Sequence, residues 1–304
     1  MASTDVHSLR DIQRQLADRA ALAERFIGAR GRRVHVLEAG EGHPLVMIHG
    51  TGNSGLFLLP LVERLEGVRA IVVDRPGFGL SDPRPSSRKH FKADAVDWID
   101  GVLDELGLDR TSLLGHSMGG LWSVWYACGR PRRVTKLVVL GAAPGLPGTR
   151  APLPFRLMAL PGVGRLLQRQ HATPASVLKF AGFVGERDAL AGQPELLDLQ
   201  VASTNDPVTK NSVRTEVQAL IPPRALLSPS TFRSPIRVQR SDLERITAPT
   251  LIVWGDREPV GSTDTADRLS KAIPDSRLEV VPGGHAPWLG EAPRVADIVS
   301  DFLR

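Results

Sequence analysis

Residues 113–120 read Leu-Leu-Gly-His-Ser-Met-Gly-Gly, and this stretch decides how the rest of the sequence is interpreted. Apolar residues precede it, and a run typical of a helix, residues 121–128, follows it. We therefore predict a strand, a one-residue corner at Ser117 and a helix. Glycines stand two residues before and two residues after the serine, where strand and helix come too close for a side chain. A glycine-rich turn with a capping serine fits the same five residues, so the rest of the chain must decide.

Composition restricts the classes of protein that need considering. The chain has 304 residues, 42% hydrophobic and 23% charged, which is typical of one large or two modest globular domains. The net charge of +5 is spread over short basic clusters without interleaved aromatic residues, which disfavours nucleic-acid binding. No apolar run reaches the roughly 18 residues of a membrane span, and the first ten residues lack a signal-peptide core. The single cysteine, Cys128, agrees with a cytoplasmic location and with core packing.

Strand and helix patterns alternate through most of the chain. Short runs that are apolar at every position suit strands buried on both faces of a parallel sheet; they are residues 45–48, 70–73, 111–114, 137–140 and 250–254. Helical patterns lie between them, which predicts an α/β fold with a mostly parallel central sheet and helices on both faces. Segments beginning at His49, Asp74 and Ser117 follow such strands and are expected at one binding crevice.

The alternation breaks in the middle of the sequence. Strand runs vanish between residues 144 and 241, prolines become dense, and short helical stretches appear at residues 175–183 and 211–220. We interpret residues 144–241 as an inserted helical lid and residues 25–143 and 242–304 as the α/β core. Residues 1–24 form a helical extension, because apolar residues recur there at spacings of three and four.

A serine hydroxyl needs a base, and that base needs an orienting acid. In folds with this serine corner, the acid and then the histidine follow the serine along the chain. His285 lies in a glycine-rich loop after the last expected strand, although a solvent-exposed loop histidine would fit the same position. The turn after the preceding strand offers two carboxylates, Asp256 and Glu258, and both remain candidates at this point.

These segments together resemble the α/β-hydrolase superfamily, in particular its lidded esterase and carbon–carbon bond hydrolase branch. The matching segments are distributed over nearly the whole chain apart from the lid and the N-terminal helix. They are residues 49–50, 74–82, 115–120, 254–259 and 284–288. The resemblance implies Glu258 as the acid, where the family usually has aspartate, with Asp256 as the alternative. It also places the oxyanion-hole N–H groups on Thr51 and Met118. His49 and Asp74 are expected to support loops.

Two reactions fit the predicted triad. The first is hydrolysis of carboxylic esters through an acyl-enzyme, with a hydrophobic or aromatic small-molecule substrate because the lid is rich in leucine, phenylalanine and valine. The alternative is hydrolysis of a carbon–carbon bond in vinylogous or β-diketone substrates. That group carries a His-Gly-x-Gly-Pro-Gly loop, which here reads His-Gly-Thr-Gly-Asn-Ser at residues 49–54. Substrate selectivity is assigned to the lid and to Phe57, Trp122 and Trp288.

Other chemistries fit less well. A serine at the corner argues against dehalogenase or epoxide hydrolase activity, whose enzymes use aspartate there; a binding scaffold would leave the triad unused, and perhydrolysis would be a side reaction. The eight histidines are scattered without a metal motif, so we expect neither metal nor cofactor. Gly50, Gly52 and Gly55 fit a dinucleotide fingerprint with Asp74 downstream, but this leaves Ser117 unexplained. The sequence does not indicate an oligomeric state.

Overall fold

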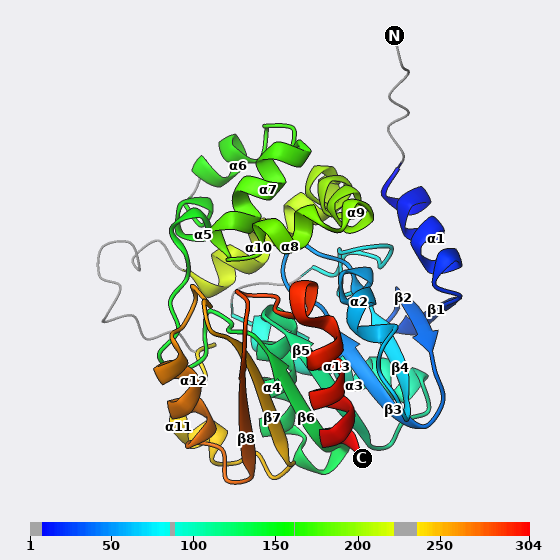
Figure 1. The fold of residues 1–304 in the computed structure, drawn as a ribbon, viewed down its shortest axis with the longest axis vertical. Helices are drawn as coiled ribbons and strands as arrows, with labels where there is room; N and C mark the ends of the chain where they lie inside the picture. Colours follow the sequence, from blue (N-terminus) through cyan, green and yellow to red (C-terminus); the bar gives the residue numbers. More distant parts are fainter. Residues whose placement is uncertain (1–7, 86–88, 161, 222–235) are drawn as a thin grey trace.

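A twisted eight-stranded sheet forms the centre of the molecule (Figure 1). The computed structural model describes residues 8–85, 89–160, 162–221 and 236–304. The strand order is β1-β2-β4-β3-β5-β6-β7-β8. The strands are β1 (Ala23–Ala29), β2 (Arg32–Ala39), β3 (His43–Ile48), β4 (Val68–Val73), β5 (Thr111–His116), β6 (Val134–Leu140), β7 (Thr250–Gly255) and β8 (Ser276–Val281).

The sheet is parallel from β4 to β8 and antiparallel at its other edge, where β2 pairs with both β1 and β4. Ile48 pairs with Gly115, and Gly115 pairs with Val139, so β3, β5 and β6 end at the same level. This confirms the predicted mostly parallel sheet and brings the loops after these strands to one end of it.

Apolar residues on successive positions of one strand enter two different cores. Val46 and Ile48 pack in the core on the side of α3 and α4, whereas Leu45 and Met47 pack in the core on the side of α2 and α13. Side chains alternate between the faces of a strand, so a strand covered on both faces must be apolar throughout. The helices of the α/β core are α2 (Leu59–Val62), preceded by the 3-10 turn Gly55–Leu58, α3 (Phe91–Glu105), α4 (Met118–Gly129), α12 (Thr263–Ser270) and α13 (Trp288–Leu303).

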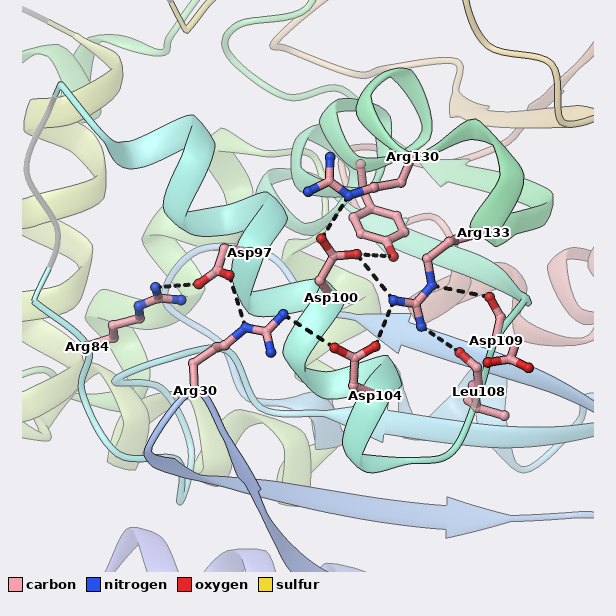
Figure 2. A network of polar contacts seen from close by, with 10 residues as sticks. Arg30, Arg84, Asp97, Asp100, Asp104, Leu108, Asp109, Arg130 and Arg133 are labelled. Carbon is pink, nitrogen blue, oxygen red and sulfur yellow. Dashed lines mark hydrogen bonds and ion pairs between the residues drawn. The ribbon is translucent and has the colours of Figure 1, made fainter.

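Helix α3 carries a row of aspartates that pair with arginines from three other segments (Figure 2). The Arg30 Nε atom, from the β1–β2 turn, lies 2.9 Å from Asp97, and the Arg133 guanidinium lies 2.7 Å from Asp104. Arg84 and Arg130 complete the network on Asp97 and Asp100. Each exposed pair contributes little by itself, about 0–1 kcal/mol, but together they join the sheet edge to α3 and to the turn after α4.

The described residues between β6 and β7 form the helical insertion, most of which Figure 1 shows in green beyond one end of the sheet. Its helices are α5 (Leu153–Met158), α6 (Val163–Leu167), α7 (Pro174–Phe183), α8 (Arg187–Ala191), α9 (Pro194–Asn205) and α10 (Pro207–Leu220), with α11 (Arg240–Leu243) just before the chain re-enters the core. Several of the dense prolines begin helices, as at α7, α9 and α10, because the first helical turn needs no N–H from proline.

Helix α1 (Leu9–Arg19) lies within residues 1–24, where the sequence predicts a helical extension. It contacts α9 of the insertion. Ser8 caps its N-terminus, and Leu16 and Ala17 are buried in the core shared with α2 and α13. Within the described part of the chain, every helix is too short or too polar to cross a bilayer.

Candidate active site

The corner at Ser117 has the strained geometry that its sequence predicts. Ser117 has φ 51° and ψ −115°, between the end of β5 and the start of α4. A Cβ added at Gly115 would collide with the Gly119 carbonyl, and one added at Gly119 would collide with the Ile48 carbonyl. The two glycines therefore allow the strand, the helix and the neighbouring β3 to meet closely enough to hold the serine in this conformation.

Three side chains from the ends of three strands form a continuous hydrogen-bonded chain. The Ser117 Oγ atom lies 2.9 Å from His285 Nε2. On the other side of the ring, His285 Nδ1 lies 2.8 and 3.0 Å from the two carboxylate oxygens of Glu258. An Nδ1–H that donates to the carboxylate leaves the Nε2 lone pair free to accept the serine proton.

Asp256, the alternative acid, lies elsewhere. Its carboxylate accepts a hydrogen bond from the Gly283 N–H at 3.0 Å and contacts the neighbouring Arg257. Glu258 instead is buried and accepts backbone N–H bonds from Ala142 at 2.9 Å and Val260 at 3.0 Å. Of the two carboxylates that the sequence left open, Glu258 is the one the structure brings to the histidine.

The charges of this pair stabilise each other. Burial raises the pKa of Glu258, but the His285 imidazole and the two backbone N–H groups outweigh it, so the pKa is lowered and the carboxylate stays ionised. Burial likewise lowers the pKa of His285, and the charge and hydrogen bond of Glu258 outweigh that effect, so its pKa is raised. The ring is therefore more basic than an ordinary buried imidazole.

A carboxylate of the insertion holds the His285 loop, and sequence reasoning missed it. The Glu186 Oε1 atom accepts hydrogen bonds from the N–H groups of Gly284 and Ala286, each at 2.8 Å. Between them, the His285 N–H donates to the Val184 carbonyl at 2.9 Å. Glu186 is buried, which raises its pKa. The signal for it in the sequence is that it is the first acidic residue after Asp109.

A second carboxylate of the insertion holds the loop after β3. Glu216 of α10 forms a buried ion pair with Arg75 and accepts a hydrogen bond from Thr51 Oγ1 at 2.9 Å. The Arg75 Nε–H donates to the His49 carbonyl at 2.9 Å, and the Arg75 N–H donates to His49 Nε2. Burial, with a smaller effect from Arg75, lowers the pKa of His49 to about 3, so that ring is neutral and supports the loop.

Asp74 also has a supporting position rather than one open to a ligand. Its buried carboxylate accepts N–H bonds from Gly55 at 2.6 Å and Leu80 at 2.9 Å and lies 2.7 Å from His35 Nδ1. The oxygens that a ribose hydroxyl would need are thus already bonded, which argues against the dinucleotide interpretation of this loop. In the described residues, no group of three or more His, Cys, Asp or Glu side chains is arranged to hold a metal ion.

An apolar cavity opens beside Ser117, between the ends of the strands and the insertion. The core contributes Thr51, Phe57, Met118 and His285 to its wall. The insertion contributes mostly apolar side chains: Pro152, Phe155, Val177, Phe180, Val184, Leu190, Val217, Leu220 and Ile221. Among the described residues that border it, none is lysine or arginine. The wall therefore suits an uncharged, apolar molecule.

Two of the three residues expected to line this pocket lie outside it, whereas Phe57 borders it. Trp288 is fully buried behind the wall, donates its indole N–H to the Phe57 carbonyl and packs edge-on against the His116 ring at 4.5 Å between centroids. Trp122 packs against Trp98, on the side of α4 that faces α3. Five residues along a helix correspond to a rotation of about 140°, which turns Trp122 away from Ser117.

His116, the residue before Ser117, also borders the cavity. Its Nε2 lies 3.1 Å from the His285 carbonyl, and its Nδ1 is buried without a hydrogen-bond partner among the described residues. Burial, followed by the neighbouring His285, lowers its pKa well below the usual value, so the ring is neutral. Because Nε2 donates to a carbonyl, Nδ1 is left as an acceptor facing the loop at Gly50.

The fold and this arrangement define a hydrolase of the α/β class. The family model described as the alpha/beta hydrolase fold matches residues 43–292, and the chain belongs to this family. It is 32% identical over 283 residues to a 2-hydroxy-6-oxononadienedioate/2-hydroxy-6-oxononatrienedioate hydrolase from Cupriavidus pinatubonensis, with 89% of this chain and 90% of that protein covered. A hydrolase of the same name from Pseudomonas putida is 31% identical, with 90% and 92% covered.

Solved structures agree on the fold. The 2-hydroxy-6-oxo-6-phenylhexa-2,4-dienoate hydrolase from a Rhodococcus species superposes with a TM-score of 0.76 at 18% identity, covering 93% of this chain and 99% of that one. A carboxylesterase from Bacillus subtilis superposes with a TM-score of 0.72 at 21% identity, covering 95% and 96%. At these identities the likeness shows the fold alone, so the bond that is cleaved must be argued separately.

Proposed function

We propose that Ser117, His285 and Glu258 are a catalytic triad that hydrolyses a bond next to a carbonyl group. The observation that carries this proposal is the chain of contacts of 2.9 Å from serine to histidine and 2.8 Å from histidine to carboxylate. His285 Nε2 takes the Ser117 proton while Oγ attacks the carbonyl carbon, and Glu258 stabilises the imidazolium that forms. The N–H groups of Thr51 and Met118 are proposed to bind the oxyanion.

Collapse of the tetrahedral intermediate breaks the bond to the leaving group, which receives the proton from His285. The acyl group stays on Ser117 until water, deprotonated by His285, attacks it and releases a carboxylic acid. The helical insertion, residues 144–241, is proposed to act as the lid over this site, on a core of residues 25–143 and 242–304 with an extension of residues 1–24. A cytoplasmic location remains part of the proposal.

The relatives favour carbon–carbon bond cleavage as the reaction. Their names describe dienol ketones that contain no ester, so hydrolysis beside the ketone carbonyl breaks a carbon–carbon bond. We therefore propose, as the first candidate reaction, hydrolysis of a carbon–carbon bond in a vinylogous diketone or a β-diketone. In the diketo tautomer of such a substrate, where the carbon beside the ketone carbonyl is saturated, the leaving group is an enolate carbon, and the proton that it receives comes from His285.

Ester hydrolysis is the second candidate, because the wall of the cavity does not match the charge of the relatives' substrates. The substrates in the relatives' names are dicarboxylates, whereas the described wall of this cavity offers no lysine or arginine and contains Glu186. A substrate carboxylate that is buried there without a counter-ion costs several kcal/mol. For either reaction, we expect the acyl part of the substrate to be apolar and uncharged.

Turnover of two neutral substrates by wild-type and Ser117→Ala protein tests the proposal. A p-nitrophenyl ester of an apolar acid reports ester hydrolysis, and a dienol ketone without carboxylates reports carbon–carbon cleavage. We expect Ser117→Ala to lower kcat on the substrate that is used by at least about 1,000-fold, with circular dichroism unchanged. Retained turnover in this variant would defeat the proposal, and the ratio of the two kcat/KM values decides between the reactions.

A further inference from the structure

The outer side of the insertion exposes an unusual number of large apolar side chains. Leu153 of α5 is 55% exposed, Leu166 of α6 is 62% exposed and Phe183 of α7 is 58% exposed. Of the ten exposed large hydrophobic residues in the described part of the chain, seven belong to these three helices; they are Leu153, Leu157, Val163, Leu166, Leu167, Phe180 and Phe183. We call this surface the outer face. Figure 1 shows α5, α6 and α7 at the end of the molecule away from the sheet.

The segment that carries the outer face is also cationic. Residues 144–185 contain five basic side chains and no acidic one: Arg150, Arg156, Arg165, Arg169 and Lys179. Four of the five are exposed and Arg156 is half-buried, and none of them forms an ion pair with a described residue. The arginines around α3 are paired with aspartates instead (Figure 2). Positive charge without counter-ions, mixed with exposed leucine and phenylalanine, occurs here in the part of the chain that covers the cavity.

The outer face continues into the wall of the cavity. Phe180 is 43% exposed and also borders the cavity beside Ser117. It packs edge-on against Phe155 of α5, with ring centroids 5.7 Å apart, and Phe155 borders the same cavity. An apolar molecule bound at the outer face would therefore lie close to the cavity that leads to Ser117.

We propose that the outer face docks on the surface of an anionic lipid bilayer. The leucine and phenylalanine side chains enter the boundary between headgroups and acyl chains, and the five cations attract the headgroup charge. A second copy of this chain fits the face poorly, because two such surfaces would bring ten positive charges together without counter-ions. Binding at a bilayer does not depend on the identity of the catalytic residues, so it can be tested separately from the reaction.

Co-sedimentation with vesicles tests the docking, using the full-length Ser117→Ala protein so that no substrate is turned over. We expect binding to vesicles of equal parts phosphatidylcholine and phosphatidylglycerol, weaker binding as salt is added, and little binding to phosphatidylcholine alone. Arg165→Gln with Arg169→Gln should lower the partition coefficient by about 30-fold, which corresponds to about 2 kcal/mol. Leu166→Ser with Phe183→Ser should also weaken binding, because these substitutions remove two of the most exposed apolar side chains.

Matched controls lie away from the outer face. Val280→Ser replaces an exposed apolar residue on β8, and Arg132→Gln with Arg294→Gln removes two exposed cations of the core. These controls should bind vesicles as the parent does. The proposal is overturned if anionic vesicles do not bind the protein, or if the controls weaken binding as much as the outer-face variants. It is also overturned if the protein is a dimer that Leu166→Ser with Phe183→Ser converts to a monomer, since the face would then pair two copies.

Discussion

The α/β core and the helical insertion place their charged side chains in different ways. Around α3, arginines from several segments pair with Asp97, Asp100 and Asp104 and hold the surface of the core together (Figure 2). In the first half of the insertion, five cations have no acidic neighbour in the sequence from residue 144 to residue 185. The arginines around α3 are thus paired within the core, while the cations of residues 144–185 form no ion pair with a described residue and remain available to a partner.

Two carboxylates of the insertion, Glu186 and Glu216, instead point into the molecule. Glu186 binds the loop that carries His285, and Glu216 binds Arg75 and the loop that carries Thr51. Core residues supply the groups proposed to make and break bonds, and the insertion supplies buried anions that hold the loops in place. If this division is right, substitutions in the core should affect the reaction most, and those in the insertion should act through stability or positioning.

The largest effect is expected at the acid of the proposed triad. Glu258→Ala removes the group that orients His285 and stabilises its positive form, so kcat should fall by about 1,000- to 10,000-fold. Asp256→Ala is the control, because that carboxylate bonds to the Gly283 N–H and contacts Arg257 rather than His285, so this variant should lower kcat far less than Glu258→Ala. Steady-state kinetics on the preferred substrate measure both. A reversed order of the two variants would show that the acid has been assigned to the wrong residue.

An intermediate effect, on stability, is expected at Glu216. Glu216→Ala leaves the fully buried Arg75 guanidinium without its counter-ion, so the free energy of unfolding should fall by about 3–5 kcal/mol. Urea unfolding monitored by tryptophan fluorescence measures the change. Glu244→Ala, which breaks an exposed pair with Arg240, is the control and should cost about 0.5 kcal/mol or less. Equal losses in the two variants would mean that the buried pair does not support the β3 loop.

The smallest and most specific effect is expected at Glu186. Glu186→Ala leaves two backbone N–H groups of the His285 loop unpaired, and kcat should fall by about 10- to 100-fold as the ring loses its position. Glu186→Gln keeps an acceptor oxygen and should recover most of that rate.

The glutamine variant also carries a pH signature. His285 must be neutral to accept the serine proton, so kcat/KM falls as pH drops through its pKa, which is raised above the usual 6.5 in part by the Glu186 charge. Removing that charge should move the acid limb of the pH profile to lower pH. An unchanged profile together with a low rate would mean that Glu186 acts only on the fold.

The parts of the molecule that the sequence predicts are those where one local rule dominates. Strands covered on both faces must be apolar throughout, and a serine corner must have glycines around it, so the parallel sheet and Ser117 follow directly. The antiparallel pairing of β2 with β4 does not follow, because the edge of a sheet is set by long-range contacts rather than by the pattern of β2 itself. The sequence could narrow the acid only to two candidates, Asp256 and Glu258. Both carboxylates lie on the same turn, and only the path of the backbone through that turn decides which of them reaches His285.

Prediction was weakest where helices pack on one another. Trp122 and Trp288 were expected in the pocket. They stand five residues after Ser117 and three after His285, but the direction of a side chain on a helix depends on rotation about its axis. The five-residue α8 and the twelve-residue α9 were not predicted, since they bury residues against the core and α1 without showing a strong periodic pattern. Glu186 was missed because its partners are backbone N–H groups, which no sequence pattern displays.

The backbone at Ser117 places the proposed reactivity and the stability of the fold in opposition at one position. A side chain at φ 51° and ψ −115° is held against its own steric preference, at a cost of about 1–3 kcal/mol, while glycine would rest there without strain. Selection for thermal stability alone would therefore favour replacement of Ser117 by glycine, which removes this hydroxyl. Variants of the chain that resist heat unusually well are the ones whose chemistry should be checked first.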